Sequence, residues 1–387
     1  MTTIVYASVG PKLTRYDIDV EAATLTARES VEVAANVQYV WPHASRRFLY
    51  VASSDSAAGM GPIGTNHYVT AFRIAPGTGA LEQHGAPIRL PHRPIHMATD
   101  VPSEHVLVAF NNPGGIRVYQ ILPDGTLGSE VAQSDGIDPG VFPHQVLATP
   151  DNRLVLLIAR GHDANTERGE VPGALKVFDY AAGMLSNEQS IEPNGGYGFG
   201  PRHLDFHPTR PWIYVSLERQ NEVAMFERVG DALAPMPAFR ANTLADPDNR
   251  RGHQLVGTVH VHPNGRFVYV ANRGGSSASM TPGAVFEAGE NSIAVFAIDP
   301  TTGEPTLVQN APSHGVHPRT FHIDPTGRLM VVAHIAGMTV RDGDTVAYVP
   351  ARLSLFRIGD DGTLSFARAY DIDVGDKLMW WMGMVSV

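Results

Sequence analysis

The sequence contains no cysteine, which excludes disulfide bonds, a thiolate nucleophile and cysteine-ligated zinc. It also lacks an uninterrupted apolar segment of about 18 residues, the minimum for a membrane-spanning helix. The first residues, MTTIVYASVGPKL, show no charged region followed by a long apolar stretch, as a secretory signal would. We therefore expect a cytoplasmic protein that makes no contact with a membrane.

Clusters of basic residues are lacking as well. The chain has 29 Lys and Arg against 39 Asp and Glu, a formal net charge of -10, and its basic residues form no run longer than a pair. Nucleic-acid binding relies on clustered Lys and Arg that contact phosphates, so we expect no nucleic-acid partner. An anionic small molecule could still bind where the fold gathers a few cationic side chains.

Glycine and proline, in contrast, are plentiful. The chain has 38 Gly and 29 Pro among 387 residues, which indicates many turns and therefore many short strands. A chain of this length exceeds the size of one ordinary hydrophobic core. It must contain either two domains or one large repetitive architecture.

One sequence unit recurs six times along the chain. It consists of a short strand, a turn with Pro and polar residues, and an apolar strand. Clear copies are HQVLATPDNRLVLLIAR from His144, HLDFHPTRPWIYVSLE from His203, VHVHPNGRFVYVANR from Val259 and TFHIDPTGRLMVVAH from Thr320; two more begin at Tyr39 and His96. Alternating segments such as IRVYQILPDGTL follow each copy and predict hairpins, so each repeat predicts about four strands.

The two ends of the chain supply a seventh unit. The N-terminal segment TIVYASVGPKLTRYDIDVEAATL resembles the later strands of a repeat, and the C-terminal KLMWWMGMV resembles its first strand. We predict an all-β protein: a single domain, residues 1–387, folded as a seven-bladed β-propeller of four-stranded antiparallel blades and closed by both termini. A β-sandwich or two small β domains would also contain short strands, but neither requires six copies of one unit.

Polar residues recur where the strands of this propeller would meet one rim. The first strand of a blade starts at the rim where the second strand ends. Six residues before the turn prolines (Pro42, Pro102, Pro150, Pro208, Pro263 and Pro325) stand Asn36, His96, His144, Arg202, Gly257 and Arg319. The second strands end near Asp55, Asn111, Arg160, Glu218, Arg273 and His334. We expect these side chains to face a shared pocket.

Four long segments follow second strands on this same rim: SSDSAAGMGPIGTNH, RGHDANTERGEVPG, RGGSSASMTPGAVFEAGENS and HIAGMTVRDGDTVAYVPA. Long loops gathered on one face usually shape a binding site. We therefore expect His96, Arg160, Arg319 and His334 to bind substrate beside Arg202. The alternative is that the rim residues form structural ion pairs across a water-filled channel.

Metal binding is a further alternative, because the 17 His include the pairs His203/His207 and His260/His262. Alternate residues of a strand share a face. However, His207 and His262 directly precede turn prolines on the opposite rim, and the chain has neither an H-E-x-x-H motif nor a three-histidine cluster. We expect no metal and no cofactor.

Two adjacent tryptophans, Trp380 and Trp381, stand on the predicted closing strand. Alternation along a strand sends neighbouring side chains to opposite faces. We expect at least one of the two rings to pack in the core.

Five segments carry a resemblance to a known family: FPHQVLATPDNR (142–153), GPRHLDFHP (200–208), VSLERQNEV (215–223), VHVHPNGRFVYVANR (259–273) and HPRTFHIDPTGR (317–328). Over essentially its whole length the chain resembles the seven-bladed β-propeller lactonases, which include propeller-type 6-phosphogluconolactonases and a 3-carboxy-cis,cis-muconate lactonizing enzyme. The resemblance implies a catalytic set of His144, Arg202, Arg273 and Glu218. These four residues could serve ring opening or ring closure.

The implied set suits lactone hydrolysis. Glu218 and His144 could divide the work of base and acid in either order, while Arg202 and Arg273 hold an anionic group. No G-x-S-x-G motif is present, so water attacks directly. We expect a metal-independent lactonase acting on an anionic sugar or organic-acid lactone.

Two alternatives remain open. One is a cycloisomerase acting on a muconate-type dicarboxylate, and the other is a non-catalytic propeller that binds a protein partner. The sequence does not indicate an oligomeric state.

Overall fold

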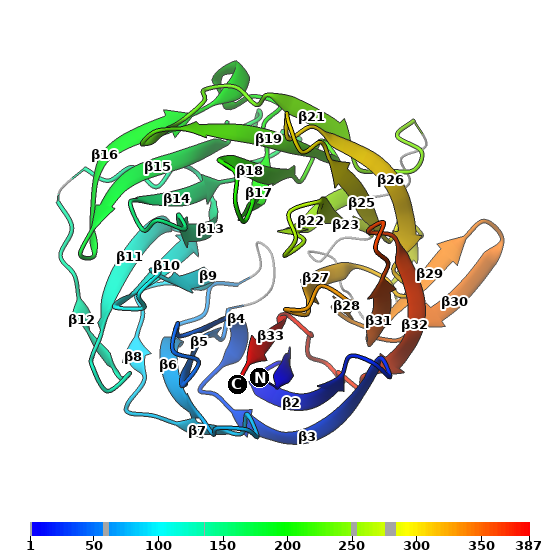
Figure 1. The fold of residues 1–387 in the computed structure, drawn as a ribbon, viewed down its shortest axis with the longest axis horizontal. Coiled ribbons are helices and arrows are strands. Elements are labelled where there is room, and N and C mark those ends of the chain that lie inside the picture. The colour runs from blue at the N-terminus through cyan, green and yellow to red at the C-terminus, as the bar shows by residue number, and fades with distance from the viewer. Residues whose placement is uncertain (1, 57–61, 135, 249–253, 275–283) are drawn as a thin grey trace.

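The computed structural model describes residues 2–56, 62–134, 136–248, 254–274 and 284–387. Within this part of the chain, seven antiparallel sheets of four or five strands stand in a ring, and an additional three-stranded sheet lies outside it (Figure 1). The inner strands of the seven sheets surround a common axis. The predicted seven-bladed propeller is confirmed.

Six blades are continuous in sequence, and their strands run from the inside to the outside of the ring in chain order. The first three contain β4(Asn36–Pro42), β5(Phe48–Ser54), β6(His67–Ile74), β7(Leu81–Gln83) and β8(Ile88–Arg89); β9(Pro94–Thr99), β10(His105–Asn111), β11(Gly114–Ile121) and β12(Leu127–Glu130); and β13(Pro143–Ala148), β14(Leu154–Ala159), β15(Ala174–Ala181) and β16(Met184–Ile191). The next three contain β17(Pro201–Phe206), β18(Trp212–Leu217), β19(Glu222–Val229), β20(Ala232–Leu233) and β21(Phe239–Asn242); β22(Gln254–Val261), β23(Phe267–Gly274), β25(Ser292–Ile298) and β26(Pro305–Pro312); and β27(Pro318–Ile323), β28(Leu329–His334), β31(Arg352–Ile358) and β32(Leu364–Asp371).

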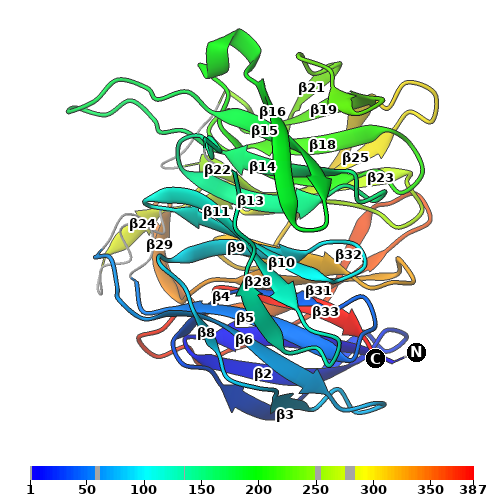
Figure 2. The same cartoon turned by 90° about the vertical axis from the view of Figure 1, so that its left-hand side faces the viewer.

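The seventh blade joins the two ends of the chain. Its strands are, from the inside outwards, β33(Met382–Ser386), β1(Thr3–Val9), β2(Lys12–Asp19) and β3(Thr24–Glu32). β33 pairs with β1 in antiparallel register, with Tyr6 opposite Gly383, and the two termini lie side by side (Figures 1 and 2). The predicted closure by both termini is therefore correct.

In the six blades that are continuous in sequence, the second strand is buried along its whole length, which explains its unbroken apolar run. In β5, β10, β14, β18, β23 and β28 every residue is buried. Each blade stacks face to face on both neighbours, so a middle strand meets apolar side chains on both of its sides. The outer strands, exposed on one side, mix polar and apolar residues.

Hydrogen bonds from buried tyrosines connect neighbouring blades. The hydroxyl groups of Tyr50, Tyr214 and Tyr269, which occupy the same place in their second strands, donate to the carbonyl oxygens of glycines in the next blade. For Tyr214 the acceptor is Gly303 at 2.8 Å. A buried tyrosine needs such a partner, and the bond fixes the spacing between blades.

The additional sheet consists of β24(Val285–Glu287), β29(Met338–Asp342) and β30(Thr345–Val349). β29 and β30 form a hairpin that extends outwards from the ring (Figure 1). The sequence predicts a loop for the segment HIAGMTVRDGDTVAYVPA, which contains this hairpin. Its Asp-Gly dipeptide, Asp342 and Gly343, is a hairpin signal flanked by alternating residues, and the structure follows that signal.

Helical structure is limited to one short 3-10 turn, η1(Pro193–Gly196), in the described part of the chain. None of the described segments forms a helix that could cross a membrane.

Candidate active site

The inner strands place one residue of each blade out of register at the same rim. In β13, β17 and β27, a residue between two paired positions has no partner across the ladder. These residues are His144, Arg202 and Arg319. Such a bulge re-aims a side chain away from the regular alternation, and bulges are common beside active sites. The equivalent positions of the other blades hold Gln38, Ile95, Gly257 and Trp380.

The position of His96 corrects the counting from the turn prolines. His96 pairs with Ala109, as His203 pairs with Ser216, so it stands one residue beyond the bulge. Pro102 lies one place later in its hairpin than Pro150 does, so counting six residues back from it stops one residue short of the bulged residue, Ile95. His96 still lies near the site, because its ring centroid is 6.1 Å from that of His203.

The same counting fails for Asn36. Pro42 is the last residue of β4 and pairs with Leu49, so it precedes the hairpin turn. The bulged residue of this blade is Gln38, two residues after Asn36.

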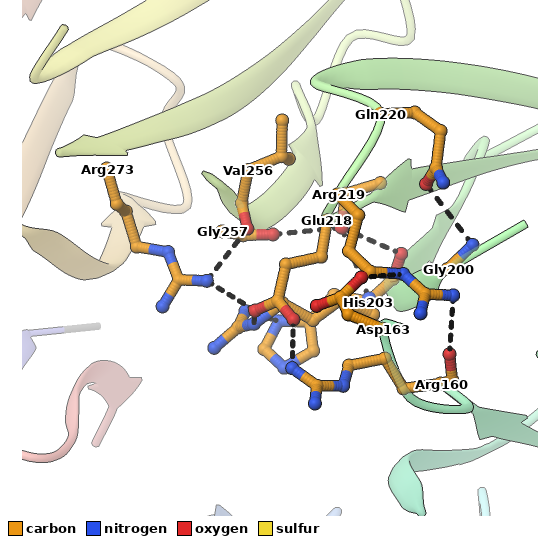
Figure 3. A network of polar contacts seen from close by, with 12 residues as sticks. Arg160, Asp163, Gly200, His203, Glu218, Arg219, Gln220, Val256, Gly257 and Arg273 are labelled. Atoms are coloured by element: carbon orange, nitrogen blue, oxygen red, sulfur yellow. Dashed lines mark hydrogen bonds and ion pairs between the residues drawn. The ribbon is translucent and has the colours of Figure 1, made fainter. Parts of the chain in front are cut away.

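Glu218 is the centre of the polar cluster at this rim. It follows the last residue of β18 and is only 4% exposed. Arg273 donates from Nη2 to its Oε1 at 2.5 Å, and Arg160 donates to Oε2 (Figure 3). Arg202 Nε lies 3.0 Å from the same Oε1. Burial alone would raise the pKa of the Glu218 carboxyl, but Arg160, Arg273 and Arg202 together hold it well below its usual value.

The cluster contains more positive than negative charge. Burial lowers the pKa of Arg202 to about 9, with a further contribution from Arg273. The pKa of Arg319 is also far below its usual value, because the residue is buried and lies near Arg202 and Arg273. A single carboxylate, that of Glu218, faces these guanidinium groups within the described residues. Nε of Arg160 and Nε of Arg273 are buried without a hydrogen-bond partner among those residues.

Two histidines adjoin the arginines. The ring centroid of His144 is 5.2 Å from that of His203, and Arg202 approaches Nδ1 of His203 at 3.4 Å. Burial, followed by the charge of Arg202, keeps the pKa of both His144 and His203 well below the usual range. Both rings are therefore neutral at pH 7. Nδ1 of His144 has no hydrogen-bond partner among the described residues.

His334 does not join this cluster. It is the last residue of β28 and pairs with Pro318, so it is the counterpart of Leu217 rather than of Glu218. Its Nδ1 donates to the carbonyl of Arg352, and its Nε2 is 3.1 Å from the Ser313 hydroxyl. The counterpart of Glu218 is Ile335, which is apolar and fully buried. The expected role of His334 in substrate binding is therefore not retained.

Two site residues escaped the sequence reasoning. His203 was considered only as the start of a repeat and as part of a possible metal-binding pair, and His317 Nε2 lies 3.3 Å from Arg273 Nη1. A tripeptide pattern could have revealed position 317. In this pattern a proline stands between a ring-bearing residue and the bulged polar residue, as in Phe142-Pro143-His144 and His317-Pro318-Arg319. Phe142 packs under Arg160, with its ring centroid 4.7 Å from the guanidinium carbon, just as His317 meets Arg273.

The histidine pairs considered as metal ligands do not form a metal site. His207 and His262 bond to the carbonyl oxygens of Gly265 and Gly327 in the next blade, so they act as packing residues. His260 lies 3.3 Å from Asp205. Across residues 2–56, 62–134, 136–248, 254–274 and 284–387, no three His, Asp or Glu side chains converge as a metal site would require.

The closing strand begins later than expected. β33 starts at Met382, one residue after Trp381, although Trp381 still exchanges hydrogen bonds with Ser8. Trp380 and Trp381 are both buried and pack in different hydrophobic clusters, as alternation predicts. Arg319 donates from Nε to the carbonyl of Trp380 at 3.1 Å, and its guanidinium carbon lies 3.4 Å from the indole centroid.

Only part of the long rim segments can be compared with the prediction. Residues 57–61 and 275–283 belong to two of them and lie outside the described residues. The segment after Arg160 approaches the cluster: Asp163 pairs with Arg219 at 3.0 Å, and Arg219 Nη2 donates to the carbonyl of Arg160 at 3.4 Å (Figure 3).

Known proteins resemble this chain in both sequence and structure. Two relatives named 6-phosphogluconolactonase are each 28% identical to it: that of Bacillus subtilis (strain 168) over 330 residues, which are 82% of this chain and 83% of the relative, and that of Pectobacterium carotovorum subsp. carotovorum (strain PC1) over 311 residues, which are 80% of each. The periplasmic gluconolactonase of Pseudomonas aeruginosa superposes with a TM-score of 0.74 at 21% identity, covering 100% of both chains. A protein from Lactobacillus plantarum superposes with a TM-score of 0.73 at 22% identity, covering 99% of this chain and 98% of the other.

The family model described as "Lactonase, 7-bladed beta-propeller" matches residues 3–341. That match spans most of the chain and agrees with the observed ring of seven blades. The protein therefore belongs to the seven-bladed β-propeller lactonase family.

Proposed function

We propose that this protein is a lactonase of the 6-phosphogluconolactonase type, which hydrolyses an anionic sugar lactone without a metal ion. The observation that carries the proposal is the pairing of one buried carboxylate, Glu218, with Arg160, Arg202 and Arg273. Buried charges are normally balanced, and this cluster has an excess of guanidinium groups. An anionic substrate would supply the missing negative charge.

The arginines suit both binding and catalysis. The buried Nε groups of Arg160 and Arg273 are donors without partners among the described residues, so substrate oxygens could accept from them. During ester hydrolysis, negative charge develops on the carbonyl oxygen of the lactone. Preorganised donors in a site shielded from water stabilise that charge more strongly than water does.

We assign the proton transfers to His144 rather than to Glu218. Arg160, Arg202 and Arg273 hold both oxygens of the Glu218 carboxylate and keep its pKa well below its usual value, so this carboxylate is poorly placed to accept a proton. The neutral imidazole of His144 can accept a proton from water as the water oxygen bonds to the lactone carbonyl carbon. It then donates that proton to the ring oxygen when the carbon–oxygen bond of the tetrahedral intermediate breaks. Glu218 holds the three arginines in position.

The expected cytoplasmic location remains part of this proposal. One structural relative is described as periplasmic, and the likeness to it concerns the fold. The names of the relatives favour hydrolysis over muconate cyclisation, which was the first alternative.

A pH-stat assay tests the proposal. Purified protein should release acid from 6-phosphogluconolactone well above the spontaneous rate, and dialysis against EDTA should leave the rate unchanged. Loss of activity after EDTA treatment would overturn metal independence. Absence of hydrolysis, together with turnover of a muconate dicarboxylate in an absorbance assay, would favour cyclisation. Inactivity in both assays would leave the non-catalytic propeller.

A further inference from the structure

A small cavity adjoins the arginine cluster between the first and seventh blades. Its volume is about 170 Å³, and its lining includes Gln38, Arg93, Lys377 and Trp380. Gln38 and Trp380 occupy the same bulged position in their blades as Arg202 does in its own. The cavity therefore has room for a group the size of a phosphate.

Trp380 contacts two arginines. The guanidinium carbon of Arg319 is 3.4 Å from its ring centroid, and that of Arg93 is 5.2 Å from the centroid of the indole system. Such cation–π contacts orient a guanidinium group without neutralising its charge. Arg93 also donates from Nε to the side-chain oxygen of Gln38 at 2.8 Å, which fixes its position at the cavity.

The charges around this cavity are predominantly positive. Arg93 and Arg319 are 5% and 7% exposed, and Arg319 has no carboxylate within ion-pair distance among the described residues. Lys377 and Asp376 also line the cavity, and their opposite charges lie 3.1 Å apart and offset each other. The Lys377 side chain is half exposed and that of Asp376 mostly exposed, whereas the two arginines are buried.

Trp380, which lines the cavity, also carries an unused donor. Nε1 of Trp380 is buried and has no hydrogen-bond partner among the described residues. The N–H group of a buried tryptophan usually finds an acceptor, and a missing one calls for an explanation. An oxyanion bound in the cavity would provide acceptor atoms for this N–H group and negative charge for the arginines.

We propose that the cavity formed by Arg93, Trp380 and Gln38 binds the phosphate group of a phosphorylated sugar lactone. The lactone carbonyl would lie at the Glu218 cluster, and Arg319 would connect the two regions through its contact with Trp380. A phosphate monoester carries between one and two negative charges at pH 7, which suits the buried charges of Arg93 in the cavity wall and of Arg319, which stacks on Trp380. The orientation of the lactone rests on the proposed function, whereas phosphate binding itself does not.

The first test compares two lactones of the same sugar, one phosphorylated and one not. Arg93→Gln should lower kcat/KM for the phosphorylated lactone by about 10- to 100-fold, mostly through KM, because charge-assisted hydrogen bonds are lost. The value for the other lactone should stay within about threefold, since specificity is a difference of affinities. The matched control is Arg210→Gln, which removes an exposed guanidinium stacked over Trp212. An equal loss on both lactones would overturn the proposal.

The second test is a calorimetric titration with inorganic phosphate. Arg93→Gln and Trp380→Phe should each weaken phosphate binding, whereas Arg210→Gln should not. Trp380→Phe keeps an aromatic platform for the arginines and serves if Arg93→Gln fails to fold. If only Arg202→Lys weakens phosphate binding, the phosphate lies at the Glu218 cluster and the proposal is overturned. Absence of phosphate binding to the wild-type protein would overturn it as well. If the wild-type protein hydrolyses no lactone, the proposed function fails while this titration still decides on the phosphate site.

Discussion

Arg273 donates a 2.5 Å hydrogen bond from Nη2 to Oε1 of Glu218 across two neighbouring blades. Both side chains are almost completely buried, and the same Arg273 nitrogen also donates to the carbonyl of Val256 at 2.9 Å. The pair therefore links the ends of β18 and β23 at the rim. Glu218 therefore has a structural role as well as any role in the reaction, so its variants are expected to change both stability and activity.

Glu218→Gln should reduce both stability and activity. Removing one partner of a buried ion pair costs about 3–5 kcal/mol in unfolding free energy, because the other partner is left uncompensated. Here three arginines lose their carboxylate. Urea denaturation measures the loss, and added phosphate should recover part of it by binding the excess positive charge. An unchanged midpoint would show that Glu218 is not needed to hold the arginines.

Arg202→Lys should reduce activity much more than stability. The substitution keeps a positive charge near Glu218 but removes the planar guanidinium group that also approaches His203. Loss of such preorganised donors costs about 10²-fold or more in kcat. Turnover and thermal melting of the same sample are the measurements, and Arg210→Lys, on the exposed turn, is the control. A fall in melting temperature that accounts for the lost activity would assign Arg202 to the fold alone.

His144→Gln should lower kcat by about 10²–10⁴-fold if His144 transfers the proton, because this is the usual contribution of general acid–base catalysis. The bound anion adds negative charge near a ring whose pKa is depressed by burial and by Arg202, so substrate binding should raise that pKa. The acidic limb of the pH–kcat profile should disappear in the variant. A variant at His84, which stacks on Phe48 far from the rim, should retain the wild-type profile. Retention of the acidic limb in His144→Gln would assign the proton transfer to another group.

Stability should fall as the pH drops below about 6.5. His144, His203, His322 and His334 are buried with lowered pKa values, about 3 for His322 and about 4 for His334. Below pH 6.5 these histidines bind protons in the unfolded chain but stay neutral in the folded one. Each contributes a slope of about 1.4 kcal/mol per pH unit until its folded pKa is reached. The lowered pKa of Glu218 acts in the same direction below about pH 4.5.

Urea denaturation between pH 4 and 8 measures this dependence. His334→Asn, which removes one buried titrating ring outside the arginine cluster, should make the slope between pH 6.5 and 4 shallower. A slope as steep as that of the wild type would show that His334 does not titrate as the folded structure requires.

Much of the fold could be predicted from local sequence. The repeated turn between two apolar strands, as in His144 to Arg160, determines a hairpin wherever it occurs, because strand burial and turn chemistry act over a few residues. Six such units and two complementary termini leave few arrangements other than a closed ring. Arg160, Arg202, Glu218 and Arg273 could be placed at one rim for the same reason.

The exact residues that face the axis could not be read by counting. The bulge that re-aims His144 or Arg202 has no local signature strong enough to fix its position, and the turn prolines do not occupy equivalent places in every hairpin. For this reason His96 stands one residue after the bulged position of its blade. In the same way Ile335, rather than His334, is the counterpart of Glu218. Register is decided by pairing between strands, which a single strand does not encode.

The sequence by itself determined the repeat, the strands and the presence of several arginines and histidines at strand ends on one rim. Tertiary structure alone decided which of them meet. Arg93, Arg319 and Trp380 come from three blades, and they stack only because the last strand of the chain pairs with the first and closes the ring. The pKa values of the buried histidines and arginines arise in the same way, since desolvation and neighbouring charges exist only once the blades have packed together.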